Sequence, residues 1–186
     1  MPLTIPNVLT LFRILAIPLI VVIYYLPFPW AGQVSGIVFG LAAITDWFDG
    51  YLARKLDQTS KFGAFLDPVA DKLIVTTALV VLVQNDPRVV LVAVAGIIIG
   101  REIAVSALRE WMSEVGARSR VKVTFFAKWK TTVQMFGIGF MLYQEPSFGL
   151  PVYDAGVVLL IVAAGLTLWS MADYLKSAWP VLRGGV

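Results

Sequence analysis

The stretch that decides the fold runs from Asp46 to Asp71 and reads DWFDGYLARKLDQTSKFGAFLDPVAD. Four of its acids, at positions 46, 49, 67 and 71, form two pairs with spacings of three and four residues. On helices, both spacings put the two carboxylates of a pair on one face. Long apolar runs flank the stretch at 34–45 and 73–83. Carboxylates so close to hydrocarbon are costly unless something pairs with them, so the pattern predicts a shared ligand.

The nature of that ligand follows from the shortage of nearby cations. The basic residues close to the four acids in sequence are Arg54, Lys55, Lys61 and Lys72. Hard divalent cations prefer oxygen ligands, so one or two ions of Mg²⁺ or Mn²⁺ would hold four converging carboxylates more simply. Such ions bind pyrophosphate oxygens and neutralise developing charge in phosphoryl transfer. The alternative is a set of solvated charges at helix ends.

Composition indicates a membrane protein made of one domain, residues 1–186. The chain is 59% hydrophobic and 15% charged, which is not the composition of an ordinary soluble domain. It has no cysteine, which excludes disulfides, thiolate nucleophiles and cysteine zinc sites, and no histidine. Any general base is therefore a carboxylate, a lysine or a tyrosine. The formal net charge of +3 is modest and does not suggest a nucleic-acid partner.

The apolar runs predict an all-α fold with six transmembrane helices, since about 20 helical residues cross a bilayer. The expected spans are 8–26, 33–54, about 60–84, 88–114, 124–143 and 153–178. The third span has two possible starts, because Ser60 could cap it or Asp67 could be the N-cap with Pro68 at the first helical position. We favour the earlier start, with Pro68 inside the helix. The N-terminus lacks a basic region and a cleavage site, so the first run is expected to be a retained span.

Charge placement orients these spans. Basic residues collect in the links after the second and fourth spans and at the C-terminus, while the three opposite links contain only Arg88. Positive charge marks the cytoplasmic side, so we expect a multi-pass membrane protein with both termini inside. The four acids then lie at the cytoplasmic face with the basic residues. An alternative for the 109–130 stretch is an ordinary anchor for anionic lipids.

Two further groups of residues accompany the acids. Asn7, Thr10 and Arg13 recur every three residues, so they share a face of the first span. Arg13 should face the protein interior or a polar cavity rather than lipid. This face is interpreted as part of a nucleotide and pyrophosphate site, with hydrogen bonding between helices as the alternative. Gly50 and Ala53 allow close approach of a nucleotide, although helix packing explains small residues equally well. Arg54 either binds a phosphate or ribose oxygen or extends to the membrane surface.

Basic residues of the second half form a separate candidate site. Arg101 stands beside Glu102 in an apolar span, which marks it as buried and either functional or structurally paired. Together with Arg118, Lys128 and Lys130 it would form a pocket for a phosphorylated acceptor. The alternative is topology charge, which accounts well for Arg118 but poorly for Arg101.

The full pattern is D-x2-D-G-x2-A-R-x8-G-x3-D-x3-D, and it resembles the signature of the CDP-alcohol phosphatidyltransferases, integral membrane enzymes of phospholipid synthesis. The flanking sequence is similar to the bacterial branch of that family that makes phosphatidylglycerophosphate. The residues that carry this finer resemblance are Pro6-Asn7, Thr10, Arg13, the run 67–72, Arg101-Glu102-Ile103, and Lys128, Lys130, Thr131, Gln134 and Met135.

The resemblance implies roles for the acids. Asp46, Asp49 and Asp67 would be metal ligands and Asp71 the general base, with a fourth metal ligand as the alternative for Asp71. It further implies transfer of a phosphatidyl group from CDP-diacylglycerol to sn-glycerol 3-phosphate. The protein would be a homodimer surrounded by the lipids of the bacterial cytoplasmic (inner) membrane. The rival functions are a sister enzyme with another acceptor, an intramembrane prenyltransferase, and an ion-coupled transporter that uses intramembrane acids as a relay.

Overall fold

The computed structural model describes residues 5–56, 61–116, 125–145 and 151–183. Within these ranges the chain forms six α-helices and no strand, which confirms the all-α prediction. The helices are α1 (Ile5–Tyr24), α2 (Ala31–Leu56), α3 (Lys61–Asn85), α4 (Val89–Glu114), α5 (Phe125–Tyr143) and α6 (Val152–Leu182). Helix α3 begins at Lys61 and contains Pro68, so the earlier of the two predicted starts is confirmed.

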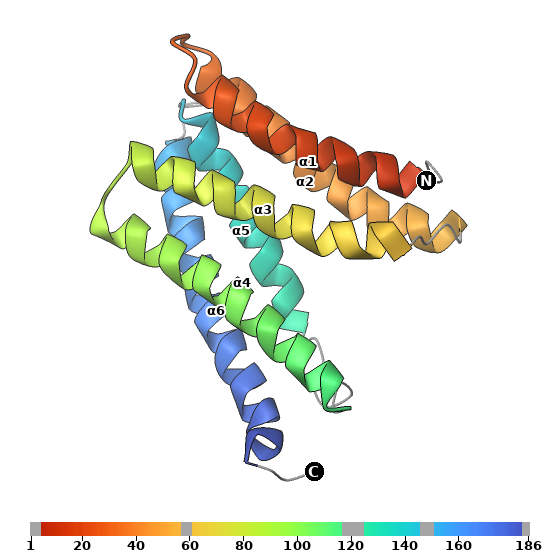
Figure 1. The fold of residues 1–186 in the computed structure, drawn as a ribbon. Helices are drawn as coiled ribbons and strands as arrows, with labels where there is room; N and C mark the ends of the chain where they lie inside the picture. Colours follow the sequence, from red (N-terminus) through yellow and green to blue (C-terminus); the bar gives the residue numbers. More distant parts are fainter. Residues whose placement is uncertain (1–4, 57–60, 117–124, 146–150, 184–186) are drawn as a thin grey trace.

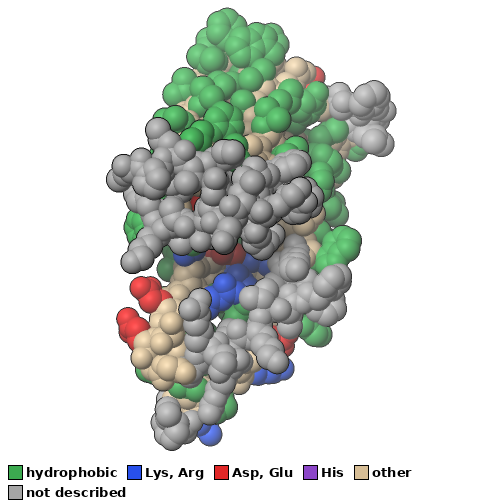
Figure 2. All heavy atoms as spheres, turned by 90° about the vertical axis from the view of Figure 1, so that its right-hand side faces the viewer, with side chains coloured by type: hydrophobic (Ala, Val, Ile, Leu, Met, Phe, Trp, Pro, Cys, Tyr) green, Lys and Arg blue, Asp and Glu red, His purple; other side chains and the backbone are tan. Residues whose placement is uncertain are grey.

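Two of these helices are long and apolar enough to cross a membrane, α4 and the 152–181 part of α6. Helices α1 and α2 contain shorter apolar stretches, Val8–Tyr24 and Ala31–Thr45. The outer surface agrees with a lipid environment, because large apolar side chains such as Leu15 and Trp169 are about 70% exposed, at 68% and 70%. Figure 2 shows such side chains covering the upper part of one face, with charged side chains gathered near its middle.

Helix α6 extends beyond the predicted end at residue 178. It continues through Pro180 to Leu182, although proline usually marks a helix end. Ala178 and Val181 are buried there against Met112 of α4, together with the partly buried Leu108 and Trp111. Burying these side chains stabilises the additional turn. The apolar pattern of α6 alone does not reveal this contact with α4.

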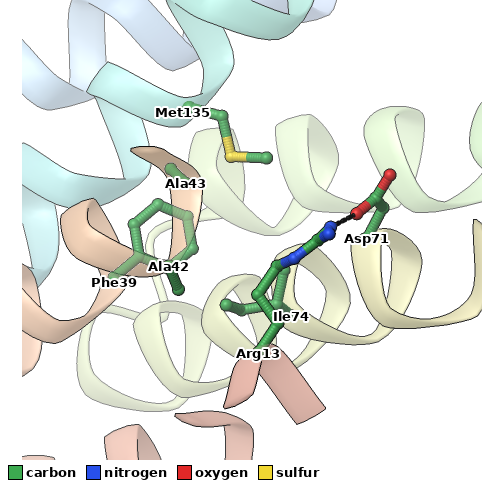
Figure 3. A pocket seen from close by; sticks show the side chains of 7 residues that line it. All are labelled: Arg13, Phe39, Ala42, Ala43, Asp71, Ile74 and Met135. Carbon is green, nitrogen blue, oxygen red and sulfur yellow. Dashed lines mark hydrogen bonds and ion pairs between the residues drawn. The ribbon is translucent and has the colours of Figure 1, made fainter. Parts of the chain in front are cut away.

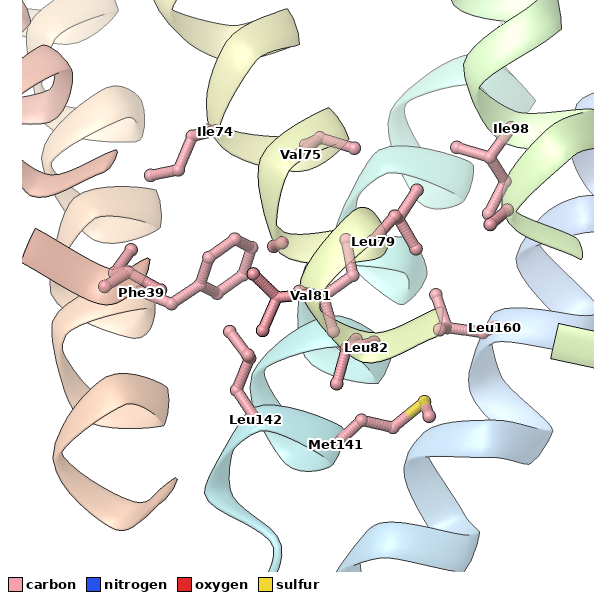
Figure 4. Close-up of a cluster of buried hydrophobic side chains, with 14 of the residues drawn as sticks. Phe39, Ile74, Val75, Leu79, Val81, Leu82, Ile98, Met141, Leu142 and Leu160 are labelled. Atoms are coloured by element: carbon pink, nitrogen blue, oxygen red, sulfur yellow. The ribbon is translucent and has the colours of Figure 1, made fainter. Parts of the chain in front are cut away.

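Helix α5 lies at the centre of the arrangement (Figure 1). It contacts α2, α3 and α6, while α1 packs on α2 and α3, and α4 packs on α6 and α3. One hydrophobic core draws side chains from all six helices, among them Phe39, Leu79, Ile98, Met141 and Leu160 (Figure 4). The ends of α2 and α3 that contain the four acids lie near the N-terminus of α1 (Figure 1).

The opposite end is closed by a polar clamp around the link between α3 and α4. Asp86 accepts hydrogen bonds from the Arg88 guanidinium, at 2.6 Å from Nη2, and from the Tyr153 hydroxyl at 2.6 Å. These hydrogen bonds, that from Arg88 first, lower the pKa of Asp86 to about 2. The clamp therefore ties α3 and α4 to the start of α6 at neutral pH.

Glycines allow α5 to approach its neighbours closely. A Cβ atom on Gly36 of α2 would lie 2.9 Å from the Tyr143 backbone nitrogen, and one on Gly156 of α6 would lie 2.9 Å from the Gly137 carbonyl oxygen. Small residues at such contacts let helix backbones pack within van der Waals distance. Both contacts involve backbone atoms, so a side chain there cannot be accommodated by a rotamer change.

We predict that Gly36→Ala lowers the free energy of unfolding by about 1–3 kcal/mol, because the added methyl group would overpack the α2–α5 contact. Gly40→Ala is the matched control, since a Cβ atom at Gly40, one turn further along α2, meets nothing within 4 Å. Alanine also favours the helix there. Denaturation in detergent, followed by circular dichroism, measures both variants. Equal stability of the two variants would contradict the packing argument.

Candidate active site

The acid stretch occupies the end of α2 and the beginning of α3. Asp46 and Asp49 lie in the second half of α2, while Asp67 and Asp71 lie one turn apart in the first half of α3. The two α3 acids are each partly buried. The side chains of Asp46, Asp49, Gly50, Ala53 and Arg54 lie outside the part of the structure that is described. The backbone therefore brings the two halves of the motif to the same end of neighbouring helices (Figure 1).

The predicted inner face of α1 meets the acids of α3. Thr10 Oγ1 donates a hydrogen bond of 2.6 Å to Asp67 Oδ1, and the Arg13 guanidinium forms an ion pair with Asp71 Oδ1 (Figure 3). Arg13 is 1% exposed, so the prediction that it faces the interior rather than lipid is confirmed, and Thr10 on the same face is 0% exposed. Their partners on α3 lie almost sixty residues away in sequence and were not predicted. The side chain of Asn7, on the same helix, is not among those described.

A small pocket surrounds the Arg13–Asp71 pair. Its other lining residues are apolar, namely Phe39, Ala42 and Ala43 of α2, Ile74 of α3 and Met135 of α5 (Figure 3). The Arg13 side chain is buried in this lining, whereas that of Asp71 is 43% exposed. A nearly buried cation thus holds a carboxylate that remains accessible from outside, which is a suitable arrangement for a group that meets a polar substrate.

A second cluster of charges lies between α4, α5 and α6. Glu102 Oε1 accepts hydrogen bonds from Lys130 Nζ at 2.7 Å and from Arg101 Nη1 at 3.1 Å. Arg101 Nη2 also donates to Ser170 Oγ at 3.1 Å. Arg101 is 8% and Lys130 is 3% exposed, so two cations are buried around one carboxylate. The prediction that Arg101 is buried is confirmed, and its pairing with Glu102 agrees with one of the two predicted alternatives, a structural pair.

Tyr174 of α6 extends this cluster toward the C-terminal ends of α4 and α6. Arg101 and Arg109 both stack on its ring, at 5.6 and 5.0 Å from the ring centroid, and Arg109 also donates a hydrogen bond to its hydroxyl group. The electron-rich face of an aromatic ring attracts cations. The ring therefore stabilises both guanidinium groups.

The remaining predicted acceptor residues are only partly placed. Arg118 lies outside the described residues, and Lys128 belongs to α5 although its side chain is not described. Conversely, sequence reasoning did not assign Ser170, Glu102 or Gln134 to a site. A signal was available, because polar residues at 102, 134 and 170 interrupt otherwise apolar helices.

The described acids fit a divalent cation by chemistry. Asp67 and Asp71 present hard oxygen donors on one face of α3, the kind of ligand that Mg²⁺ and Mn²⁺ prefer. A hydroxyl group and a guanidinium orient the two carboxylates, as outer partners of metal ligands often do. Among the described side chains alone no group of three acids gathers, since those of Asp46 and Asp49 are not included.

Comparison with known sequences identifies the family to which this helical fold and acid motif belong. The profile of the CDP-alcohol phosphatidyltransferase family matches residues 3–169, and the chain belongs to that family. The resemblance seen in the Asp46–Asp71 motif is thereby confirmed, and the chain is a transferase.

Individual relatives are similar along nearly the whole chain. A protein of Pseudomonas fluorescens is 50% identical over 180 residues, covering 96% of this chain and 92% of its own length. Proteins of Haemophilus influenzae and Escherichia coli K12 are each 47% identical over 178 residues, covering 96% of this chain and 95% and 96% of their own lengths. All three are named CDP-diacylglycerol–glycerol-3-phosphate 3-phosphatidyltransferase.

The pairing of Glu102 with two buried cations generates a prediction about stability. Glu102→Leu should lower the free energy of unfolding by about 3 kcal/mol or more, because it leaves two buried cations without their carboxylate. Lys130→Met should cost less, since Glu102 keeps Arg101 as a partner and is 30% exposed. The double variant should lose less stability than the sum of the two single changes.

Denaturant unfolding of the variants in detergent measures these differences. Glu110→Leu is the control, because it is the same substitution at an exposed position of α4. Strictly additive effects of Glu102→Leu and Lys130→Met would show that the two side chains are not coupled.

Proposed function

We propose that the protein transfers the phosphatidyl group of CDP-diacylglycerol to the 1-hydroxyl group of sn-glycerol 3-phosphate, which yields phosphatidylglycerophosphate and CMP. The observation that carries this proposal is the sequence identity of 47–50%, along 96% of the chain, with proteins named for this reaction. The two polar clusters support it, because a carboxylate site suits a metal-bound pyrophosphate and a buried cation site suits a phosphorylated acceptor.

In this proposal the acids bind the donor end. Asp46, Asp49 and Asp67 would hold Mg²⁺ or Mn²⁺, which would neutralise charge on the pyrophosphate oxygens when bound. Asn7, Thr10, Gly50, Ala53 and Arg54 would border the cytidine nucleotide. The hydrogen bond from Thr10 fixes the orientation of the Asp67 carboxylate, so the ligand needs little rearrangement before it binds.

Asp71 is the proposed general base. Its carboxylate would take the proton of the acceptor hydroxyl as that oxygen bonds to the phosphatidyl phosphorus. The bond from this phosphorus to the bridging pyrophosphate oxygen breaks, and its electron pair leaves with CMP. Arg13 is a positioning residue for this step, because its ion pair holds the carboxylate toward the accessible side of the pocket. The chain has no histidine, which leaves a carboxylate as the natural acceptor of the proton.

The cluster around Glu102 would receive the acceptor phosphate. Arg101 and Lys130 are the described cations of this site, and Arg118 and Lys128 would complete it. A phosphate that leaves water needs several N–H donors, and arginine provides them in a planar fork while lysine acts as a point charge. Ser170 and Glu102 hold the two cations in place for it.

We also propose the setting in which this reaction takes place. All six helices would cross the bacterial cytoplasmic membrane, with both termini and the two polar clusters at the cytoplasmic face. The distribution of basic residues supports this orientation. A site at that face would meet a lipid donor from the membrane and a soluble acceptor from the cytoplasm. The protein would act as a homodimer.

We predict that the purified protein moves radiolabelled phosphatidyl groups to glycerol 3-phosphate and not to serine or inositol phosphate. A chelator should abolish the transfer, and Mg²⁺ or Mn²⁺ should restore it. Transfer to another acceptor from the panel would favour a sister enzyme, and absence of any transfer would favour the transporter. Full turnover in metal-free buffer would refute the metal site.

The same assay separates the acids. Asp67→Asn should raise the metal concentration needed for half-maximal activity, because it removes a charged ligand. Asp71→Asn should reduce the rate by about 10²–10⁴-fold while metal and CDP-diacylglycerol still bind, as expected for a general base. Loss of metal binding in Asp71→Asn would make this residue a ligand instead.

Acceptor recognition gives a further prediction. Arg101→Gln and Lys130→Gln should raise KM for glycerol phosphate about 10- to 100-fold, because each removes a charge-assisted hydrogen bond. The KM for CDP-diacylglycerol should change much less. Lys176→Gln is the control, since it removes an exposed basic residue from α6. An equal rise in the donor KM would assign these cations to the pyrophosphate.

A further inference from the structure

Gln134 of α5 is a buried polar residue that the proposed mechanism does not use. It is 3% exposed, and its Oε1 atom has no hydrogen-bond partner among the described residues. A buried amide oxygen without a partner is costly, and such groups are uncommon in folded proteins. An apolar residue at this position would avoid the cost, so a partner that arrives from outside would explain the glutamine.

The position of Gln134 on α5 indicates what that partner is. It lies four residues after Lys130 and therefore on the same helix face, one turn deeper than the cation that binds Glu102. Met135, the next residue, lines the pocket of Arg13 and Asp71 (Figure 3). Gln134 thus lies on the part of α5 between the cation cluster and the candidate base.

The acceptor of the proposed reaction has its groups in the same order. Its phosphate is attached to carbon 3, its reacting hydroxyl group to carbon 1, and a secondary hydroxyl group to carbon 2 between them. With the phosphate on Arg101 and Lys130 and the reacting hydroxyl group at Asp71, the secondary hydroxyl group would lie between them, beside the segment of α5 from Lys130 to Met135 that contains Gln134.

We propose that Gln134 is a specificity-determining residue that hydrogen-bonds the secondary hydroxyl group of the acceptor; this inference rests on the proposed function. An amide suits the task, because its oxygen accepts from a hydroxyl group and its nitrogen donates to one. A site built to bond a buried hydroxyl group discriminates against an analogue that lacks it, since the amide then stays without a partner. Gln134 would select a glycerol phosphate over a plain phosphorylated alcohol.

The test compares two acceptors, sn-glycerol 3-phosphate and 3-hydroxypropyl phosphate, which lacks only the secondary hydroxyl group. The full-length enzyme should prefer the first by about tenfold or more in kcat/KM. Gln134→Met should reduce kcat/KM for glycerol phosphate about tenfold and change the value for the analogue less than about twofold. Gln33→Met is the control. It makes the same chemical change in a partly buried residue at the N-terminal end of α2, away from the acids, and should leave the acceptor preference intact.

A second readout separates recognition from a structural role. Replacing a buried polar group without a partner by an apolar one of similar shape is neutral or stabilising, so Gln134→Met should unfold at the same or a higher denaturant concentration. A clear loss of stability, or an equal loss of kcat/KM for both acceptors, would overturn the inference. A wild-type enzyme that uses glycerol phosphate without preference over the analogue would overturn it as well.

Failure of the proposed function has a different signature. In that case the wild-type enzyme transfers no phosphatidyl group to glycerol phosphate. The role of Gln134 in recognising this acceptor is then refuted together with the reaction.

Discussion

The burial of charge among apolar helices is the constraint on which this structure depends. Arg13, Arg101 and Lys130 are each less than one-tenth exposed, and a cation in such surroundings is stable only beside an anion or a strong acceptor. Asp71 and Glu102 are the anions in question, and each belongs to a different helix from at least one of its cations. These pairs fix how α1 lies on α3 and how α5 lies near α4. The outer surface can then remain apolar, because these charges are paired inside.

Helix α5 links the two polar clusters. Its Lys130 belongs to the Glu102 cluster, while its Met135 closes the pocket of Arg13 and Asp71. The same helix is held against α2 and α6 by contacts that only glycine permits at Gly36 and Gly156. Close packing of α5 therefore sets the separation between the carboxylate that would activate the acceptor and the cations that would hold its phosphate.

Much of this arrangement follows from the sequence. The Asp46–Asp71 motif predicts the family, and a lone arginine inside an apolar run predicts that Arg13 points inward. The helix order and the start of α3 follow from apolar runs and their breakers. The bond between Thr10 and Asp67 spans 57 residues and that between Arg101 and Ser170 spans 69, so no local pattern contains them. The last turn of α6 was underestimated for the same reason, because it depends on Met112 of another helix. The roles proposed for the acids and for the metal remain predictions.

The division of the molecule into two polar clusters has an evolutionary consequence. Asp67 and Asp71 with their partners come from α1 and α3, whereas the Glu102 cluster is built from α4, α5 and α6. If the Glu102 cluster binds the acceptor as proposed, mutations in the second half can alter acceptor binding without changing the carboxylates of the first half. An ancestral gene of this design would be able to give rise to descendants with new head-group products while the chemistry at phosphorus is inherited unchanged.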